Sequence, residues 1–162
     1  DTRLQESVDG VARHGHALTV ALFDLDHFKS VNDTYGHPAG DTVIQGLAAI
    51  VSEQSRSTDV CCRYGGEEFA IIMTDTSPTE AKVVCERIRE DLKSKTWARH
   101  PERQSTGSFG LGGVMEGATV KSDPAEWLEA ADQNLYTAKT NGRDRVVASD
   151  MSAPKVHLAE AG

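Results

Sequence analysis

The sequence predicts an α+β fold with a mainly antiparallel central sheet flanked by helices. Short apolar stretches of strand length alternate with longer stretches whose apolar residues recur at helical spacing. Their order is strand, helix, hairpin, helix, strand, helix, which favours helices packed on one face of the sheet, close to the split βαβ plan. The 162 residues suffice for a single domain with its own core.

The first half of the chain contains a strand, a helix and a hairpin. The apolar run 18–23 is the strand, and apolar residues at helical spacing predict the helix over 39–53. Two β-rich stretches, 60–64 and 69–73, are joined through Gly65-Gly66. We expect a tight hairpin there, because glycine tolerates the positive φ angles that such turns demand.

Capping signals mark two helices in the second half. Ser77-Pro78-Thr79-Glu80 is a capping-box pattern that begins the first helix. Asp123-Pro124 begins the second, which Gly142 is expected to end. Strands are predicted over 104–111, where glycines interrupt the pattern, and over 145–148.

Composition and charge narrow the classes of function. The chain is 38% hydrophobic and 26% charged, as globular domains usually are. Its net charge of −8 argues against a nucleic-acid polymer as partner, since no broad basic surface can release counterions. No apolar run reaches the length of a transmembrane helix. The three cysteines lack metal-ligand spacing, so we expect a cytoplasmic protein in which Cys61 and Cys62 pack rather than form a disulfide.

A carboxylate at the end of the first apolar strand is one candidate site residue. Asp24 directly follows the strand, and a buried carboxylate is costly unless it is paired, hydrogen-bonded or metal-bound. Asp26 is better suited to cap the following helix. We therefore predict Asp24 as a ligand of a hard divalent cation such as Mg²⁺, which takes one or two carboxylates plus substrate phosphates.

Two further carboxylates, Glu67 and Glu68, follow the glycine pair at the tip of the hairpin. Solubilising an exposed turn is the commoner role of such a pair, but the acidic site at Asp24 favours a functional one. If the first strand lies beside the hairpin, Asp24 and Glu67 converge on one metal ion.

Several motifs together resemble the GGDEF domain of the diguanylate cyclase family. The two longest are Phe-Asp-Leu-Asp-His-Phe-Lys-Ser-Val-Asn-Asp-Thr-Tyr-Gly-His over 23–37 and Arg-Tyr-Gly-Gly-Glu-Glu-Phe over 63–69. The segments 108–110, 131–139 and Gly142-Arg143 follow in the family's order. The resemblance implies a palm-like nucleotidyl cyclase core that converts two GTP molecules to cyclic di-GMP and two pyrophosphates.

The resemblance also implies a metal centre with two Mg²⁺ ions per active site. Asp24, Glu67 and the backbone carbonyl of Leu25 match its ligands. Glu67 is further implied as the base for the attacking hydroxyl. Glu68 could orient the metal centre or ligate a metal ion, and with Lys29 it completes the implied catalytic set.

For the substrate, the resemblance implies GTP. Asn32 and Asp41 match the positions that read guanine, whose donor and acceptor pattern suits an amide and a carboxylate. Taken alone, these two residues are more typical of a turn and a helix start. The other matching substrate positions, most of them near the phosphates, are Phe28, Lys29, His37, Lys139 and Arg143.

An Arg-x-x-Asp pair, Arg56 and Asp59, precedes the hairpin at the offset of the family's inhibitory product site. Such a pair is ordinarily a surface ion pair of little energetic value. The resemblance implies inhibition by cyclic di-GMP at this site, with Arg87 as a secondary contact.

The chain departs from the family pattern at its start and near its end. The family's opening segment is present at most as Thr2-Arg3, so we expect a fragment of a longer protein that could be tethered to a membrane. The predicted domain covers 1–149, and 150–162 form a flexible tail. Asp144 stands where Asn is common.

The resemblance leaves more than one function open. Because one protomer holds one GTP, catalysis implies a homodimer. The alternatives are a non-catalytic module that senses GTP or cyclic di-GMP, and another nucleotidyl cyclase or transferase on the same palm.

Overall fold

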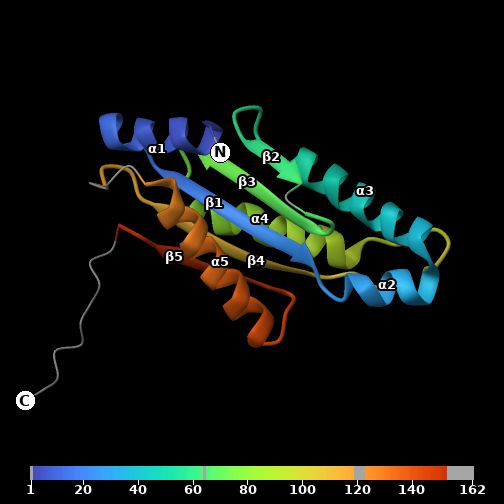
Figure 1. Ribbon diagram of the computed structural model, residues 1–162. Helices are drawn as coiled ribbons and strands as arrows, with labels where there is room; N and C mark the ends of the chain where they lie inside the picture. The colour runs from blue at the N-terminus through green and yellow to red at the C-terminus, as the bar shows by residue number, and fades with distance from the viewer. Residues whose placement is uncertain (1, 64, 119–122, 153–162) are drawn as a thin grey trace, which may run out of the picture.

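A five-stranded mixed sheet forms the centre of the protein, and the computed structural model describes residues 2–63, 65–118 and 123–152. The strand order is β2-β3-β1-β4-β5 (Figure 1). β1 pairs antiparallel with β3 and β4, whereas β5 is parallel to β4, so the predicted, mainly antiparallel sheet is confirmed. The strands are β1 (Leu18–Leu25), β2 (Val60–Arg63), β3 (Glu68–Thr74), β4 (Gly107–Val114) and β5 (Arg145–Asp150).

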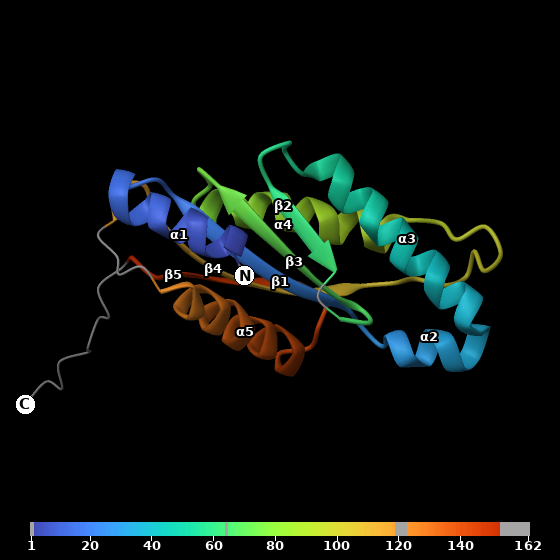
Figure 2. The same ribbon diagram turned by 45° about the horizontal axis from the view of Figure 1, so that its top comes forward.

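Helices cover both faces of the sheet, so the expectation of helices on one face was wrong. Figure 2 shows α4 and α5 on opposite sides of the strands. The reason lies in β1, whose eight residues are all buried, as in strands covered on both faces. One face packs against α3 (His37–Gln54) and α4 (Pro78–Ser94), the other against α1 (Thr2–His14) and α5 (Pro124–Thr140).

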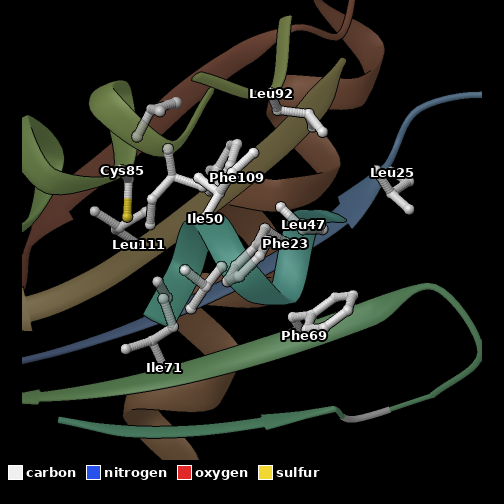
Figure 3. Close-up of a cluster of buried hydrophobic side chains, with 14 of the residues drawn as sticks. Phe23, Leu25, Leu47, Ile50, Phe69, Ile71, Cys85, Leu92, Phe109 and Leu111 are labelled. Carbon is white, nitrogen blue, oxygen red and sulfur yellow. The ribbon is translucent and has the colours of Figure 1, made fainter. Parts of the chain in front are cut away.

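A row of three phenylalanines organises the core beneath α3 and α4. The ring of Phe23 in β1 stacks on Phe69 of β3 at 5.5 Å and on Phe109 of β4 at 4.8 Å between centroids (Figure 3). Because side chains alternate along a strand, the next residues, Asp24, Glu68 and Ser108, turn to the other face. The aromatic row therefore fixes the register of a polar row beside it.

The predicted elements are present, with shifted bounds. The capping box at Ser77 and Glu80 is confirmed by both of its hydrogen bonds. α1 was not predicted, and α2 (Phe28–Tyr35), directly after β1, is the helix that Asp26 was expected to cap. Cys61 and Cys62 are exposed on the edge strand β2, so the expectation that they pack was wrong. β5 extends to Asp150 at the start of the predicted tail, of which 153–162 lie outside the described residues.

Close contact between α5 and β4 explains the glycines of this strand. A Cβ at Gly110 would lie 2.1 Å from the backbone nitrogen of Leu135 and 2.2 Å from the carbonyl oxygen of Ala131. Both atoms belong to the α5 backbone and cannot move aside individually. The glycines therefore allow the helix to rest directly on the strand, which is continuous and buried along its whole length.

We expect Gly110→Ala to lower the free energy of unfolding by about 3 kcal/mol or more, because overpacking here pushes backbone against backbone. Gly10→Ala is the matched control, since nothing lies within 4 Å of a Cβ at this helical position. It should stabilise the protein by up to about 1 kcal/mol. Urea unfolding measures both changes, and an unchanged midpoint for Gly110→Ala would contradict the close-contact explanation.

Candidate active site

The candidate residues meet at one end of the sheet. β1 ends there, whereas β3, β4 and β5 begin there, since β1 is antiparallel to its neighbours. α2 begins and α5 ends at the same end (Figure 1). In the register of the strands, Asp24 lies between Glu68 and Ser108.

Asp24 is buried, with 5% of its surface exposed. The ammonium of Lys139 lies 2.5 Å from its Oδ2, whereas its buried Oδ1 has no hydrogen-bond partner among the described residues. Burial raises the pKa of Asp24; Lys139 opposes this shift, and the charges of Glu68 and Asp26 add to it. The ionised carboxylate is thus only partly compensated, which favours a further cation at Oδ1.

Asp26 does not cap a helix, contrary to the prediction. The N-cap of α2 is His27, which makes no side-chain capping bond. Asp26 instead accepts hydrogen bonds from the hydroxyls of Thr106 (2.7 Å) and Ser108 (2.6 Å) and from the backbone N–H of Asp144 (3.0 Å). This buried carboxylate ties the end of β1 to the beginnings of β4 and β5.

The hairpin between β2 and β3 is present, but its geometry differs from the expected one. Gly66 does not adopt a positive φ angle. The guanidinium of Arg63 holds the turn by donating to the carbonyl oxygens of Gly65 and Gly66. Nothing in the sequence motif alone pointed to this role of Arg63.

The two hairpin glutamates occupy different positions relative to Asp24. Glu68 begins β3 and is the direct cross-strand neighbour of Asp24, whereas Glu67 lies one residue earlier in the turn. Glu68, rather than Glu67, contributes to the raised pKa of Asp24. Within the described ranges, no group of three or more His, Cys, Asp or Glu side chains is arranged to hold a metal.

The predicted guanine-reading residues lie between α2 and α3. Asn32 packs so closely against Gly40 that a Cβ at this glycine would meet its Oδ1 at 1.9 Å and the ring of Phe28 at 3.1 Å. The Oδ1 of Asn32 is buried without a hydrogen-bond partner among the described residues. Asp41, the next residue after Gly40, is exposed. A buried amide oxygen that has no partner among the described residues and an exposed carboxylate are therefore placed on adjoining helices.

Exposed residues flank this pair of helices. Lys29 lies in the first turn of α2, and His37 begins α3. The first backbone N–H groups of a helix have no intrahelical acceptor, which makes the beginning of α2 suited to an anion.

The turn after α5 brings a second cation to the acidic end of the sheet. Gly142 ends the helix as predicted, with φ +119° and with the N–H of Arg143 donating to the carbonyl of Ala138 at 2.9 Å. Arg143 itself has a left-handed φ of 63°, and its Nη1 lies 3.8 Å from Oδ1 of Asp26. Lys139 and Arg143 are thus both brought to the acidic cluster.

Asp144 forms a clamp that the sequence did not reveal. Its carboxylate binds Arg89 at 2.8 Å and Lys93 at 2.7 Å, both on α4. Burial alone would raise the pKa of Asp144, but the hydrogen bonds from Lys93 and Arg89 and their charges outweigh it, so the pKa lies below its usual value. The clamp fastens α4 to the turn that carries Arg143.

Asp144→Asn is expected to lower the free energy of unfolding at pH 7 by about 1–2 kcal/mol, allowing for solvent screening of the half-exposed Lys93. Because the folded pKa is depressed, this contribution is present above the unfolded value near 3.8 and is lost as the pH falls through the lower folded pKa. Urea unfolding at pH 7 and pH 3 checks this.

The difference between wild type and Asp144→Asn should therefore shrink at pH 3. Glu90→Gln is the control, because Glu90 pairs with the same Arg89 from a position whose side chain is 61% exposed. It should change stability by less than about 0.5 kcal/mol. An equal difference at both pH values would refute the clamp.

The predicted inhibitory pair closes a turn at the end of α3. The Oδ2 of Asp59 accepts the backbone N–H of Arg56 at 2.9 Å, and its buried Oδ1 has no hydrogen-bond partner among the described residues. Both residues line a groove of about 600 Å³ beside β2. Arg87 lines a different groove, on α4, so the structure does not bring it to this pair within one chain.

Known proteins share both the sequence pattern and the fold. The family model described as "Diguanylate cyclase, GGDEF domain" matches residues 1–145. Diguanylate cyclase A of Treponema denticola is 37% identical over 138 residues, which is 85% of this chain and 37% of that protein.

Solved structures of GGDEF domains have the same fold as this chain. The GGDEF domain of DgcB from Caulobacter crescentus in complex with c-di-GMP matches with a TM-score of 0.81 and 31% identity, covering 91% of this chain and 86% of that one. An active GGEEF domain of a Vibrio cholerae diguanylate cyclase matches with a TM-score of 0.83 and 28% identity, covering 91% and 92%.

These matches identify the class of the domain as a GGDEF domain. The chain belongs to the GGDEF family of diguanylate cyclases. It spans 29% to 38% of the length of the first curated relatives it matches. Within its described residues, no helix is long and apolar enough to cross a membrane.

Proposed function

We propose that this domain condenses two GTP molecules into cyclic di-GMP and two pyrophosphates. The observation that carries the proposal is Asp24, whose buried Oδ1 has no partner in the described part of the chain, at the point where Glu68 and Lys139 also meet. A buried, incompletely compensated carboxylate is typical of a functional site. Family membership supports cyclase chemistry at this position.

The donors at this end of the sheet fit Mg²⁺. Asp24, the backbone carbonyl of Leu25 and Glu67 would hold two ions per site, and all offer the hard oxygen ligands that Mg²⁺ prefers. Glu68 lies opposite Asp24 and can orient or complete this set. Mg²⁺ bound by one or two carboxylates keeps coordination positions for phosphate oxygens of the substrate. When bound, Mg²⁺ neutralises charge on the reacting phosphate.

Guanine is read, in this proposal, between α2 and α3. The unsatisfied Oδ1 of Asn32 accepts from the base, and the exposed carboxylate of Asp41 accepts from its ring N–H and amino group. Adenine presents the opposite donor pattern along this edge and would leave both oxygens unpaired. Phe28, which lies beside Asn32 and Gly40, supplies apolar contact.

The triphosphate extends from this pocket towards the sheet. Lys29 and the first N–H groups of α2 bind its oxygens from one side, with His37 nearby at the beginning of α3. Lys139 and Arg143, already held at Asp24 and Asp26, bind them from the other side. These cations offset the charge of the phosphates even though the whole chain is acidic.

Catalysis then requires two domains, since each holds one GTP. Glu67 takes the proton from the 3′-hydroxyl, which attacks the α-phosphate of the GTP held by the second domain, and pyrophosphate leaves. We therefore propose a homodimer as the catalytic form. The free cysteines support a cytoplasmic setting for it.

Glu67→Gln is expected to reduce turnover by about 10²-fold or more, because it removes the base and one metal ligand. Cyclic di-GMP formed from GTP and Mg²⁺ is measured by chromatography, over a range of protein concentrations. Glu6→Gln is the control, since Glu6 is exposed on α1 away from the site. Retained activity in Glu67→Gln would remove Glu67 from the mechanism.

The same assay and a calorimetric titration separate a cyclase from the two alternative functions. If wild type forms no product even when two copies are fused, the domain is a non-catalytic sensor. Calorimetric titration should show GTP binding more tightly than ATP, and equal affinities would favour a different nucleotidyl transferase.

We further propose that cyclic di-GMP inhibits the domain at Arg56 and Asp59. The groove beside β2 and the partnerless Oδ1 of Asp59 support this, since Arg and Asp together match the acceptor and donor groups of guanine. Arg87, which lines its own groove on α4, would contact the product from a second domain.

Arg56→Ala should raise the product concentration needed for half-inhibition by about tenfold or more, because it removes charge-assisted hydrogen bonds. Initial rates at increasing cyclic di-GMP concentration give this value. Arg13→Ala, an exposed arginine on α1, should leave it unchanged. Equal inhibition of wild type and Arg56→Ala would overturn the assignment.

A further inference from the structure

We propose that a cavity behind the α2–α3 pair binds a small planar organic anion, with an aromatic carboxylate as the best-suited class. The cavity has a volume of about 540 Å³ and lies between the α2–α3 connection and the segment after α4. Its lining residues are Tyr35, Pro38, Ala39, Thr42, Trp97, Ala98, Arg99, His100 and Arg103.

The lining is cationic in an otherwise acidic chain. It includes the guanidinium groups of Arg99 and Arg103 but no aspartate or glutamate, although the net charge of the protein is −8. The carboxylate of Glu102, whose side chain is 64% exposed to solvent, lies 3.8 Å from Nδ1 of His100, and its charge also acts on Arg103. The cavity therefore favours an anion over a cation or a neutral ligand.

Arg103 is the central residue of this cavity. Its guanidinium lies 5.3 Å from the ring centroid of Tyr35 and 4.8 Å from that of Trp97. Its Nε and Nη1 are buried without a hydrogen-bond partner among the described residues, and burial lowers its pKa. The two rings stabilise the cation, but its buried N–H groups still lack an acceptor among the described residues, so an anionic acceptor beside it is favourable.

The unsatisfied groups at this cavity are all donors. The indole Nε1 of Trp97 is also buried and has no acceptor within residues 2–63, 65–118 and 123–152. A ligand that contributes acceptor oxygens therefore complements the site, whereas one that contributes only donors does not.

Size and shape favour an organic body over an inorganic anion. A volume of about 540 Å³ lies within the range of small-molecule sites, about 300–1,000 Å³, and exceeds what phosphate fills. Tyr35, Pro38, Ala39 and Trp97 provide apolar lining for a flat ring. The anionic group would then lie towards Arg99, His100 and Arg103.

This site is distinct from the proposed nucleotide pocket and does not depend on it. Tyr35 ends α2, and Pro38 and Ala39 form the first turn of α3. Asn32 and Gly40, which pack together between the same helices, do not line the cavity. A ligand here would join α2 and α3 to the segment after α4.

The test uses the whole chain without nucleotide and three probes: 2-naphthoate, the neutral 2-naphthamide and inorganic phosphate. The signal is the indole N–H resonance of Trp97 in ¹H–¹⁵N NMR spectra. Trp127, buried on the opposite face of the sheet, is the internal control. We expect a saturable shift of Trp97 alone with 2-naphthoate, and binding about tenfold weaker or more with either other probe.

Variants identify the cationic side chain that binds the carboxylate of the probe. Arg103→Met should weaken 2-naphthoate binding by about tenfold or more, whereas Arg13→Met, at an exposed position on α1, should not change it. Should Arg103→Met not fold, Arg99→Gln at an exposed lining position should weaken binding by about threefold. The proposal is overturned by no saturable shift, by equal binding of 2-naphthamide, or by unchanged affinity in the folded cavity variants.

Discussion

The hydrogen bonds of Asp26 hold together the end of the sheet on which the whole site is built. Its carboxylate accepts from Thr106, Ser108 and the backbone of Asp144, so three segments far apart in the chain meet at one buried group. A buried, fully bonded carboxylate has few alternative arrangements. Asp24, two residues earlier, differs, because one of its carboxylate oxygens has no hydrogen-bond partner in the part of the chain that the structure describes. The structural and the functional carboxylate thus differ in how fully each is satisfied.

Local signals in the sequence predicted much of the fold. The capping box at Ser77, the glycine that ends α5 and the apolar periodicity of α3 each act within a few residues, and each was confirmed. α1 was missed even though Leu4, Val8 and Val11 recur at helical spacing. The two-faced sheet was missed because the continuous burial of β1, which needs covering on both sides, was not used to place the helices.

The sequence identified candidate site residues but not how these residues pair in space. Asp24 was recognisable because a carboxylate at the end of an apolar strand is unusual. The pairing of Asp24 with Glu68 depends on strand register, which a hairpin motif does not specify by itself. The hydrogen-bond partners of Asp26 lie 80 or more residues away in the sequence, and the partners of Asp144 in the clamp lie 51 or more residues away. No local pattern could therefore reveal either role.

The missing side chain at Gly110 has a consequence for the cation at Asp24. Since α5 touches the backbone of β4 there, the helix cannot slide along the strand without collision. A displacement by one helical turn, about 5.4 Å, would carry Lys139 out of reach of Asp24. The placement of a charged group is therefore set four to eight residues away along the helix, at Leu135 and Ala131, by a contact that involves no charge at all.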